Sequence, residues 1–303
     1  MTFLVADDVR LAVEDGRPVV ALETSVIGQG LPHPRNLECL ERMEGAIRDA
    51  GALPVWTAVL DGAIRVGLDR LELERIARPG PATKVARRDL PIAVAAGAVG
   101  ATTVSATIWA AHRAGIAIAA TGGTGGVHPG TTPDVSADLL ELARTAVLLV
   151  SSGPKSIVEP EATVEKLEEL GVAVVGYGVD RLPFFLAREA PVALEHRVET
   201  PEEAAGLARA QRATGVDAAV LLCNPIPAAH ALDPDELRAA THRAEARMAQ
   251  EGVAGKDVTP YLLRALAEET GGRSLEANLV LLEENARLAA RIAAALSEAT
   301  SGR

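Results

Sequence analysis

Residues 120–139 form a glycine-rich segment whose backbone could bind an anion. The run TGGTGG at 121–126 follows a short apolar stretch, 116–120, that predicts a buried strand. Glycines let the backbone adopt positive φ and bring its N–H groups close to a negative charge. The segment therefore predicts a phosphate-binding loop. The alternative is a glycine-rich surface turn that leads into an ordinary helix cap.

Two carboxylates follow this loop, one helical turn apart. Asp134 and Ser136 precede an apolar-periodic segment that starts at Leu139, so one of them is expected to cap a helix whose N–H groups favour negative charge. Asp138 lies one turn beyond Asp134. Carboxylate oxygens of this kind suit Mg²⁺ or Mn²⁺ better than Zn²⁺, which prefers His and Cys. On spacing, either carboxylate could hold the metal.

Lysine is rare in this chain, and one lysine stands where an amine could react. The sequence contains Lys84, Lys155, Lys166 and Lys256, and arginine supplies the other basic side chains. A surface lysine can be exchanged for arginine at small cost, whereas a nucleophilic amine cannot. Lys155 follows an apolar strand at 145–150 through the turn SSGP. An amine there would be partly desolvated and could attack a carbonyl, and the alternative is a simple phosphate contact. Lys166 lies on a charged helix face.

A carboxylate and a basic cluster stand at two further predicted element ends. Residues 17–22 predict a buried strand that runs into Glu23, a common position for a catalytic acid or base. The run TKVARRDL at 83–90 places Lys84 beside two arginines. This cluster could bind phosphate, and the alternative is a solvated turn in which Arg88 pairs with Asp89.

The pattern of apolar residues and turns predicts a single α/β domain over residues 1–303 with a mixed, largely parallel sheet. The mixed character follows from a hairpin, 54–60 and 63–67, joined by Asp61-Gly62. Further strands are expected at 17–22, 91–96, 116–120, 145–150, 172–177 and 218–222. Helices are expected at 36–50, capped by Asn36 and stopped by Gly51, at 71–77, 102–114 and 201–214, and in three pieces that start near 235, 259 and 274.

Three further polar residues lie near predicted element ends. His112 is expected to be structural. Asn224, in an Asn-Pro turn after a strand, could reach the site or simply satisfy its own turn. Asn278 precedes an apolar run within a predicted helix and is expected to face inward.

Composition excludes several classes of function. A net charge of -11, a pI near 5.1 and 2% aromatic residues argue against a nucleic-acid partner. Cys39 and Cys223 are too few and too far apart for a disulfide framework or a zinc knuckle. Residues 1–16 lack a basic n-region with an apolar core, and no apolar run reaches the length of a membrane span. The expectation is a cytoplasmic protein with a small-molecule ligand and no membrane partner.

Several motifs, in order along the chain, resemble those of one enzyme family. They are LET at 22–24, KVARRDL at 84–90, TGGTGGVH at 121–128, DVSADL at 134–139, GPKSI at 153–157, NPIP at 224–227 and GKDVTP at 255–260. Together they look like the pseudouridine-5'-phosphate glycosidases, or indigoidine-synthase-A-like family. The resemblance covers nearly the whole chain and implies reversible cleavage of pseudouridine 5'-phosphate to uracil and ribose 5-phosphate, with Mn²⁺, by a homotrimer with a three-layer α/β/α fold.

The resemblance also implies a role for each site residue. Glu23 would be the proton donor and Lys155 the amine that forms an imine with ribose C1'. Asp134 would bind the metal. The substrate would be bound by Lys84, Val104, His128, Ser136, Ala137, Asp138 and Asn278, with Lys84, His128 and Asn278 near its phosphate.

The sequence departs from the family pattern in small ways, and other functions compete. Thr24-Ser25 stands where the family tends to have Ser-Thr, Glu159 replaces a frequent Asp, and the loop 128–134 is two residues shorter. Another sugar-phosphate lyase or aldolase could use the same lysine imine. A non-catalytic nucleotide-binding protein would bind without turnover. A sugar kinase is disfavoured because no Walker lysine motif is present.

Overall fold

The central strands of the molecule are buried on both faces. In the computed structural model, which describes residues 2–80, 82–130, 134–253, 255 and 258–301, strands β2 (Val19–Glu23), β7 (Ile118–Ala120) and β10 (Leu148–Ser151) consist of buried residues throughout. Successive side chains of a strand point to opposite faces. Accordingly, Val20 and Leu22 belong to one hydrophobic core, and Val19 and Ala21 to another. Such a sheet needs a layer of helices on each side.

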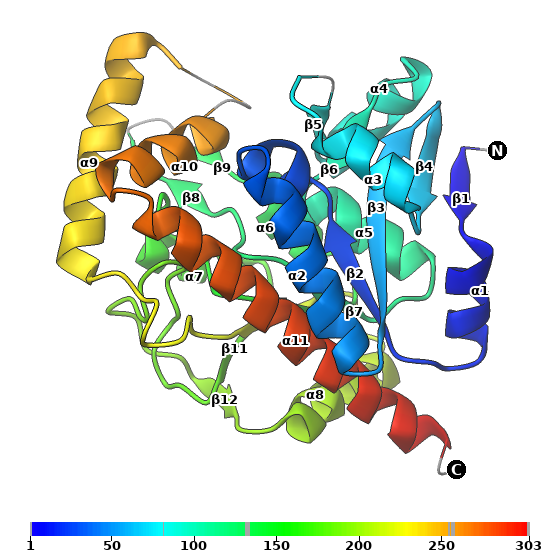
Figure 1. Ribbon diagram of the computed structural model, residues 1–303. Helices are drawn as coiled ribbons and strands as arrows, with labels where there is room; N and C mark the ends of the chain where they lie inside the picture. The colour runs from blue at the N-terminus through cyan, green and yellow to red at the C-terminus, as the bar shows by residue number, and fades with distance from the viewer. Residues whose placement is uncertain (1, 81, 131–133, 254, 256–257, 302–303) are drawn as a thin grey trace.

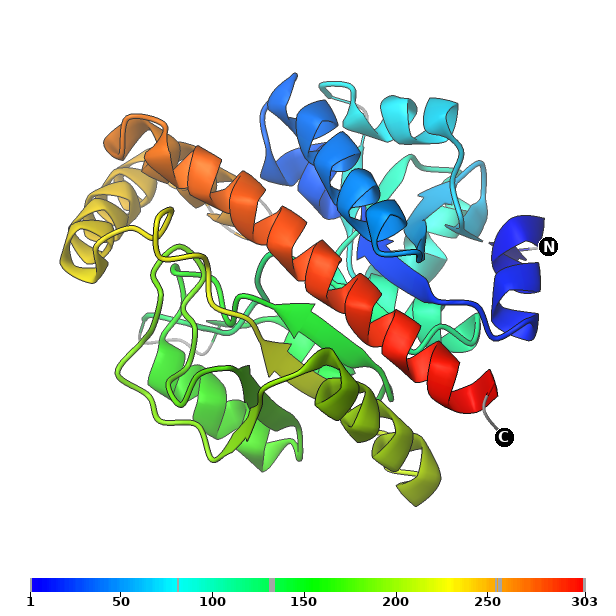
Figure 2. The ribbon, with the colours of Figure 1, turned by 60° about the horizontal axis from the view of Figure 1, so that its bottom comes forward.

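Helices supply both layers, which confirms the expected three-layer α/β/α fold (Figure 1). One face is covered by α2 (Arg35–Asp49), α8 (Pro201–Thr214) and α11 (Arg273–Ser301), with α3 (Arg70–Ala77) beside them. Figure 2 shows α11 crossing this face between α2 and α8. The other face carries α1 (Asp7–Glu14), α4 (Leu90–Ala95), α5 (Val104–Arg113), α6 (Ala137–Leu142) and α7 (Pro160–Glu169).

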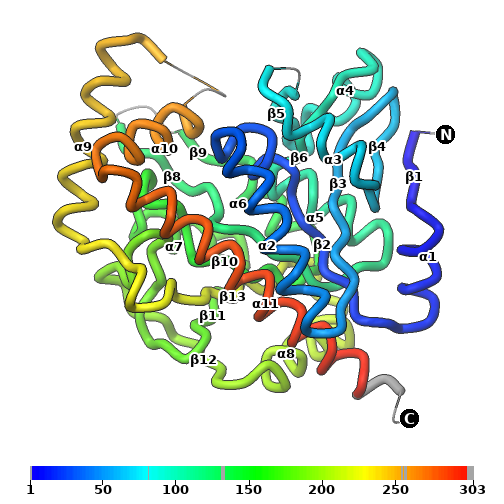
Figure 3. The backbone as a smooth tube through the Cα atoms, in the orientation of Figure 1, coloured from blue at the N-terminus to red at the C-terminus, as the bar shows by residue number. Residues whose placement is uncertain are grey.

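The sheet has the strand order β1-β4-β3-β2-β7-β10-β13-β11-β12, and β6 adds β5 beside β3. Figure 3 shows β1 and β12 on opposite sides of the molecule. Strand β3 runs antiparallel to β4 and β6, and all other neighbours are parallel. The remaining bounds are β1 Phe3–Val5, β3 Leu53–Leu60, β4 Ala63–Val66, β5 Thr83–Val85, β6 Gly100–Thr102, β11 Ala173–Tyr177, β12 His196–Val198 and β13 Val220–Cys223. The predicted hairpin is confirmed, since Asp61 and Gly62 both have positive φ between β3 and β4.

The strand predicted at 91–96 was wrong. Residues Leu90–Ala95 form α4, because Pro91 suits the first turn of a helix and burial recurs at Leu90 and Ala93. Ile92 is 69% exposed, which no central strand would allow. The sheet positions in this region belong to β5 and β6, which the apolar pattern missed because each spans three residues. The predicted helix at 102–114 correspondingly begins later, at Val104.

The start of α2 also differs from the prediction. Pro34 precedes the helix, and Asn36 lies inside it. The Asn36 amide donates to the carbonyls of Ile27 and Ala77, at 2.8 Å each, and therefore joins α2 to its neighbours instead of capping it. The predicted stop is confirmed, because Gly51 follows the helix with a φ of 79°.

Two shorter helical pieces and a second small sheet complete the chain. A π-helical turn, η1 (Val26–Gly30), follows β2, and a 3₁₀ turn, η2 (Arg87–Asp89), precedes α4. Strands β8 (Val127–His128) and β9 (Asp134–Val135) pair antiparallel. Helices α9 (Pro234–Glu251) and α10 (Val258–Glu269) pack on each other, and with α11 they are the three predicted C-terminal pieces. None of the described helices has the length and apolar character needed to cross a bilayer.

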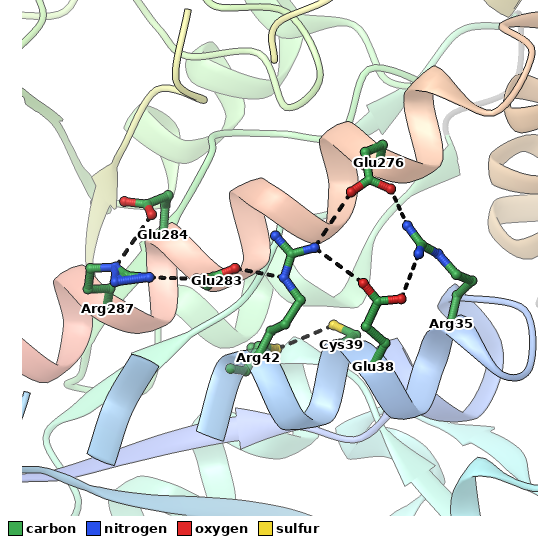
Figure 4. Close-up of polar contacts among 9 residues, drawn as sticks. Arg35, Glu38, Cys39, Arg42, Glu276, Glu283, Glu284 and Arg287 are labelled. Atoms are coloured by element: carbon green, nitrogen blue, oxygen red, sulfur yellow. Dashed lines mark hydrogen bonds and ion pairs between the residues drawn. The ribbon is translucent and has the colours of Figure 1, made fainter. Parts of the chain in front are cut away.

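An ion network joins α2 to α11 (Figure 4). Arg42 lies at its centre, with its Nε 2.7 Å from Glu283 and its Nη1 3.5 Å from Glu38. Arg287 also pairs with Glu283, at 2.6 Å. These side chains are only partly exposed, so solvent screens them less than it screens a surface pair.

Arg42→Met is expected to lower the free energy of unfolding by about 1 kcal/mol at neutral pH, and by less in high salt. Burial works to raise the pKa of Glu283, but hydrogen bonds from Arg287 and Arg42 outweigh it, so the pKa lies below its ordinary value. A carboxylate of this kind stabilises the fold above its unfolded pKa, about 4.3, and the contribution is lost as pH falls through the folded value. Urea unfolding at several pH values should show a shallower acid loss for the variant.

Arg10→Met is the matched control, because Arg10 pairs with Asp7 and Glu14 at a side-chain exposure of 50%. This substitution should leave the free energy of unfolding nearly unchanged. Equal effects of the two substitutions would contradict a special contribution from the α2–α11 network.

Candidate active site

Neighbouring parallel strands place the residues predicted for the site at one edge of the sheet. Strands β2, β7, β10 and β13 lie side by side, so their carboxyl ends open onto the same edge. Glu23 ends β2, the glycine-rich loop follows β7, and Lys155 follows β10. A cavity of about 290 Å³ lies there, close to the lower end of the range for small-molecule sites.

Nearly all residues predicted for the site line this cavity. They are Glu23, Lys84, His128, Asp134, Ser136, Ala137, Asp138, Lys155 and Asn278. Val104 differs, because its side chain is 2% exposed and belongs to the core beneath the site. Val104 is the first residue of α5, so any contact that it makes with a ligand must come from its main chain.

Glu23 is held by two hydroxyl groups. Its side chain is buried, with 4% of the residue exposed. The Ser25 hydroxyl donates to Oε2 at 2.5 Å, and the Thr121 hydroxyl donates to Oε1. Each carboxylate oxygen therefore has its own donor, which fixes the orientation of the acid toward the cavity.

Lys155 also has a defined position. Its Nζ donates to the Gly123 carbonyl at 2.6 Å, and its backbone N–H donates to Thr124 O at 2.9 Å. The sharp turn before it needs glycine, because Gly153 has a φ of 78° and a Cβ there would lie 1.9 Å from Pro183 O. The amine is thus partly buried and held at the cavity wall.

The glycine-rich loop is built differently from the prediction. Positive φ was expected at Gly122, Gly123, Gly125 and Gly126, but none of them has it. The glycines instead allow close packing: a Cβ at Gly125 would lie 2.2 Å from Ser136 Oγ, and one at Gly126 would lie 2.4 Å from Thr163 Oγ1. The loop does line the cavity, at Gly122, Gly123 and Gly125.

Asp138 connects the loop to the start of α5. Its Oδ1 accepts from Ser105 N at 3.0 Å, and its Oδ2 accepts from Gly125 N at 3.1 Å. Ser136, and not Asp134, caps α6, because its hydroxyl accepts from Asp138 N. With both oxygens engaged by backbone donors, Asp138 is poorly placed to bind a metal ion.

Asp134 is the carboxylate that fits a metal ion better. It is exposed beside the cavity, and no donor in the described part of the chain holds it. The described residues contain no cluster of three or more His, Cys, Asp or Glu side chains arranged for a metal. The donor set therefore suits a hard, largely hydrated cation bound through one carboxylate, as Mg²⁺-like ions often are.

His128 sits among positive groups. Burial lowers the pKa of its imidazole, and the charges of Lys84 and Lys155 lower it further, while Asp134 works to raise it. His128 is therefore mainly neutral at neutral pH and can serve as a hydrogen-bonding group. The charged amines of Lys84 and Lys155, with the imidazole of His128 beside them, favour an anionic ligand in this part of the cavity.

The basic side chains of residues 83–90 point in two directions, some to the cavity and one to α6. Lys84 and Arg88 line the cavity, which agrees with the phosphate alternative. Arg88 Nε also lies 3.9 Å from Asp89 Oδ1, so the predicted Arg88–Asp89 ion pair is present as well. Arg87 points away and forms a 2.7 Å ion pair with Glu141, a buried carboxylate on α6. This pair joins the Lys84 region to the helix that follows the loop.

The sequence missed the residues that hold the acid and the amine. Ser25 and Thr121 were not singled out, and neither was Asn285, which is 0% exposed. Asn224 does not line the cavity but donates to Asn285 Oδ1 at 3.0 Å. The available signal was spacing, because Asn285 lies two helical turns after Asn278 on the same face of α11.

Other reactive or titratable groups lie away from the site. Cys39 and Cys223 are free, and burial raises the pKa of each thiol to about 12. His112 contacts Ala146 O at 3.2 Å, outside the cavity. Lys166 pairs with Glu169 at 2.8 Å. Lys256 and Asp257, in the motif at 255–260, and residues 131–133, in the shortened loop, lie outside the described residues.

Comparison with known proteins points to one family. The family model "Indigoidine synthase A like protein" matches residues 8–295. Proteins named pseudouridine-5'-phosphate glycosidase from Symbiobacterium thermophilum and Deinococcus radiodurans are 46% and 47% identical. Each alignment covers 95% of this chain, with 96% of the first relative and 92% of the second.

Two solved structures are similar over nearly their full length. One is the prealnumycin C-glycosynthase in complex with ribulose 5-phosphate, with 39% identity, a TM-score of 0.91 and coverage of 100% of this chain and 99% of that chain. The other is an indigoidine synthase A-like protein from Thermotoga maritima, with 39% identity, a TM-score of 0.90 and coverage of 98% and 97%.

Proposed function

The chain belongs to the indigoidine synthase A-like family, and on that premise we propose that it is a pseudouridine-5'-phosphate glycosidase. It reversibly cleaves the C–C glycosidic bond of pseudouridine 5'-phosphate to uracil and ribose 5-phosphate. The observation that carries the proposal is the joint placement of Lys155 and Glu23, an amine and a buried carboxyl group at one cavity. The full-length relatives that bear this enzyme name support the choice of substrate.

Cleavage of a C-glycoside needs both groups. No oxygen leaves with the base, so the two-carboxylate scheme of ordinary glycosidases does not suffice. The Lys155 nitrogen bonds to C1' as the C1'–O4' bond breaks, and O4' takes the proton that the attacking amine gives up. The nitrogen lone pair then forms C1'=N while the C1'–C5 bond breaks. The bond electrons stay on uracil C5, which takes a proton from Glu23. Water adds to the imine, and ribose 5-phosphate and the free amine are released.

The phosphate is assigned to the basic side of the cavity. Lys84, Arg88 and the neutral His128 lie there, together with Thr103, the residue before α5. Binding energy from this remote group orients C1' toward Lys155 without taking part in the bond change. Asn278, 8% exposed on α11, is a further polar wall of the same cavity.

Asp134 is the residue proposed to hold Mn²⁺, with water as the other ligands. A bound divalent ion would supply positive charge and ordered water beside the substrate. Asp138 is proposed to position the loop through its two backbone contacts and to bind no metal.

Asp134→Asn is expected to weaken Mn²⁺ binding by at least about tenfold, because a carboxylate that no donor among the described residues holds loses its charge. Titration of free Mn²⁺ by electron paramagnetic resonance measures binding directly, without relying on turnover. Glu165→Gln, on an exposed helix face, is the matched control and should leave Mn²⁺ affinity unchanged. Unchanged affinity in Asp134→Asn would show that the metal is held elsewhere.

The deciding experiment is uracil release from pseudouridine 5'-phosphate in the presence of Mn²⁺, followed by ultraviolet absorbance, and the reverse synthesis from uracil and ribose 5-phosphate. An aldolase or another sugar-phosphate lyase would form a borohydride-trappable imine but release no uracil. A non-catalytic nucleotide-binding protein would bind the phosphate ligand and turn nothing over. An inert wild-type protein would overturn the proposal.

The working form is proposed to be a cytoplasmic homotrimer, as the family resemblance implies. Helix α10 lines the cavity, and α9 packs on α10 at one end of the molecule (Figure 1). We propose these two helices as the subunit contacts. Analytical ultracentrifugation tests the trimer, and a monomeric, fully active protein would contradict it.

A further inference from the structure

One short segment contacts both groups proposed to react. Residues 121–123, here called the bridging segment, follow β7. The Thr121 hydroxyl donates to Glu23, and the Gly123 carbonyl accepts from Lys155 Nζ at 2.6 Å. The position of this segment therefore sets the separation between the acid and the amine.

The bridging segment is tied to β10 and the turn after it by the bonds Thr121 N to Val150 O, 3.0 Å, and Ser152 N to Gly122 O, 2.8 Å, and an amide from the C-terminal helix adds further donors. Asn285 Nδ2 donates to Thr121 O at 2.8 Å and to Gly122 O at 3.3 Å. Asn285 is itself fixed, because its Oδ1 accepts from Asn224 Nδ2 at 3.0 Å and it bonds the Ser152 hydroxyl at 3.1 Å. The amide is fully buried, so solvent cannot replace these bonds.

Packing leaves the bridging segment little room to move. A Cβ at Gly122 would lie 3.1 Å from Leu282 on α11, and one at Gly123 would lie 2.8 Å from Phe185. The segment is thus enclosed between α11 and Phe185.

We propose that Asn285 is a positioning residue for C–C bond cleavage, acting through the bridging segment on both Glu23 and Lys155. Asn285 does not line the cavity, so it touches no substrate. The proposal rests on the proposed function and predicts different defects for a change at Thr121 and a change at Asn285. The Thr121 hydroxyl positions Glu23 alone, whereas Asn285 positions both Glu23 and Lys155 through the bridging segment.

Thr121→Val removes the hydroxyl and keeps the shape of the side chain. It should lower kcat for uracil release by roughly 10- to 100-fold, since misplacing a catalytic group by about 1 Å costs up to that factor, while KM stays the same. Trapping of ribose 5-phosphate on Lys155 by borohydride should proceed at the wild-type rate. Thr121→Ser should restore kcat, because the donor returns. Thr107→Val is the matched control and should keep the wild-type kcat, because the buried Thr107 hydroxyl bonds to the hydroxyls of Thr57 and Thr102 and does not line the cavity.

Asn285→Leu removes both donors and should slow uracil release and imine trapping together. Because buried carbonyls lose a partner, its Tm should fall, and rates are compared at a temperature where circular dichroism shows full folding. The double variant Thr121→Val/Asn285→Leu should release uracil no more slowly than Asn285→Leu alone, as expected for residues that act through one contact.

The outcomes separate this inference from the proposed function. Wild-type protein that releases no uracil overturns the proposed function. An active wild type with an Asn285→Leu variant of normal kcat and normal trapping overturns the positioning role. Fully additive losses in the double variant also overturn it, because Asn285 would then act independently of Thr121. Slow trapping and slow release in a folded Asn285→Leu protein, with release alone slowed in Thr121→Val, supports it.

Discussion

Lys155→Ala is expected to lower uracil release from pseudouridine 5'-phosphate by at least about 10⁴-fold, because removal of a covalent nucleophile leaves only binding and electrostatic assistance. The wild-type Nζ is fixed at 2.6 Å from Gly123 O, at the wall of the cavity. Incubation with ribose 5-phosphate and borohydride should attach one sugar phosphate to the wild-type chain and none to the variant, as measured by mass spectrometry of peptides.

Lys155→Arg separates a nucleophile from a phosphate contact. Arginine keeps the positive charge and the capacity to donate to Gly123 O, but it stays protonated and cannot form an imine. If Lys155 only bound phosphate, the variant would keep much of its activity and its affinity for inorganic phosphate. We expect no detectable release. Lys166→Arg, on the surface with Glu169 as its partner, is the matched control and should behave as the wild type.

The sequence predicted the place of Lys155 at the cavity because its surroundings are local. Pro154 and Gly153 set the turn before Lys155, and a lysine in a chain that otherwise uses arginine indicates a need for an amine. Glu23 was found in the same way, at the end of a strand whose residues are all buried. Features that depend on neighbouring residues in the chain were thus predictable.

Features that depend on distant contacts were not. Asn285 lies 164 positions from Thr121 and meets it only because α11 crosses the sheet over β7 and β10. Gly125 and Gly126 were expected to provide positive φ, whereas their role is set by close contact with Ser136, the N-cap of α6, and with Thr163 of α7. In each case the reason for the residue is another segment that local patterns do not specify.

The same limit explains the misassigned strand. The apolar run that forms α4 has residues suited to a buried strand, and only packing shows that Ile92 faces solvent while Leu90 and Ala93 do not. The edge of the sheet there is formed by β5 and β6, where Gly100 allows close contact with Val85 and Val59. Tertiary contacts therefore override strand propensity.

Glu23→Gln is the second substitution with a large expected effect, because it keeps the size of the side chain and removes the proton that uracil C5 must receive. We expect kcat for uracil release to fall by about 10²- to 10⁴-fold, the usual contribution of a positioned general acid. Ser25 and Thr121 can still contact the amide, so the variant should fold with a Tm close to that of the wild type.

Glu23→Gln should lose C–C cleavage but keep imine formation on Lys155. Imine formation between Lys155 and ribose 5-phosphate does not require protonation of uracil, so borohydride trapping should persist while C–C cleavage and synthesis both fail. Glu44→Gln, a partly exposed carboxylate that accepts from the Trp56 indole outside the cavity, is the matched control and should keep the wild-type rate. The two directions must lose equal factors in kcat/KM, because the variant cannot change the equilibrium constant. A Glu23→Gln protein that releases uracil at the wild-type rate would place the proton transfer on a different residue.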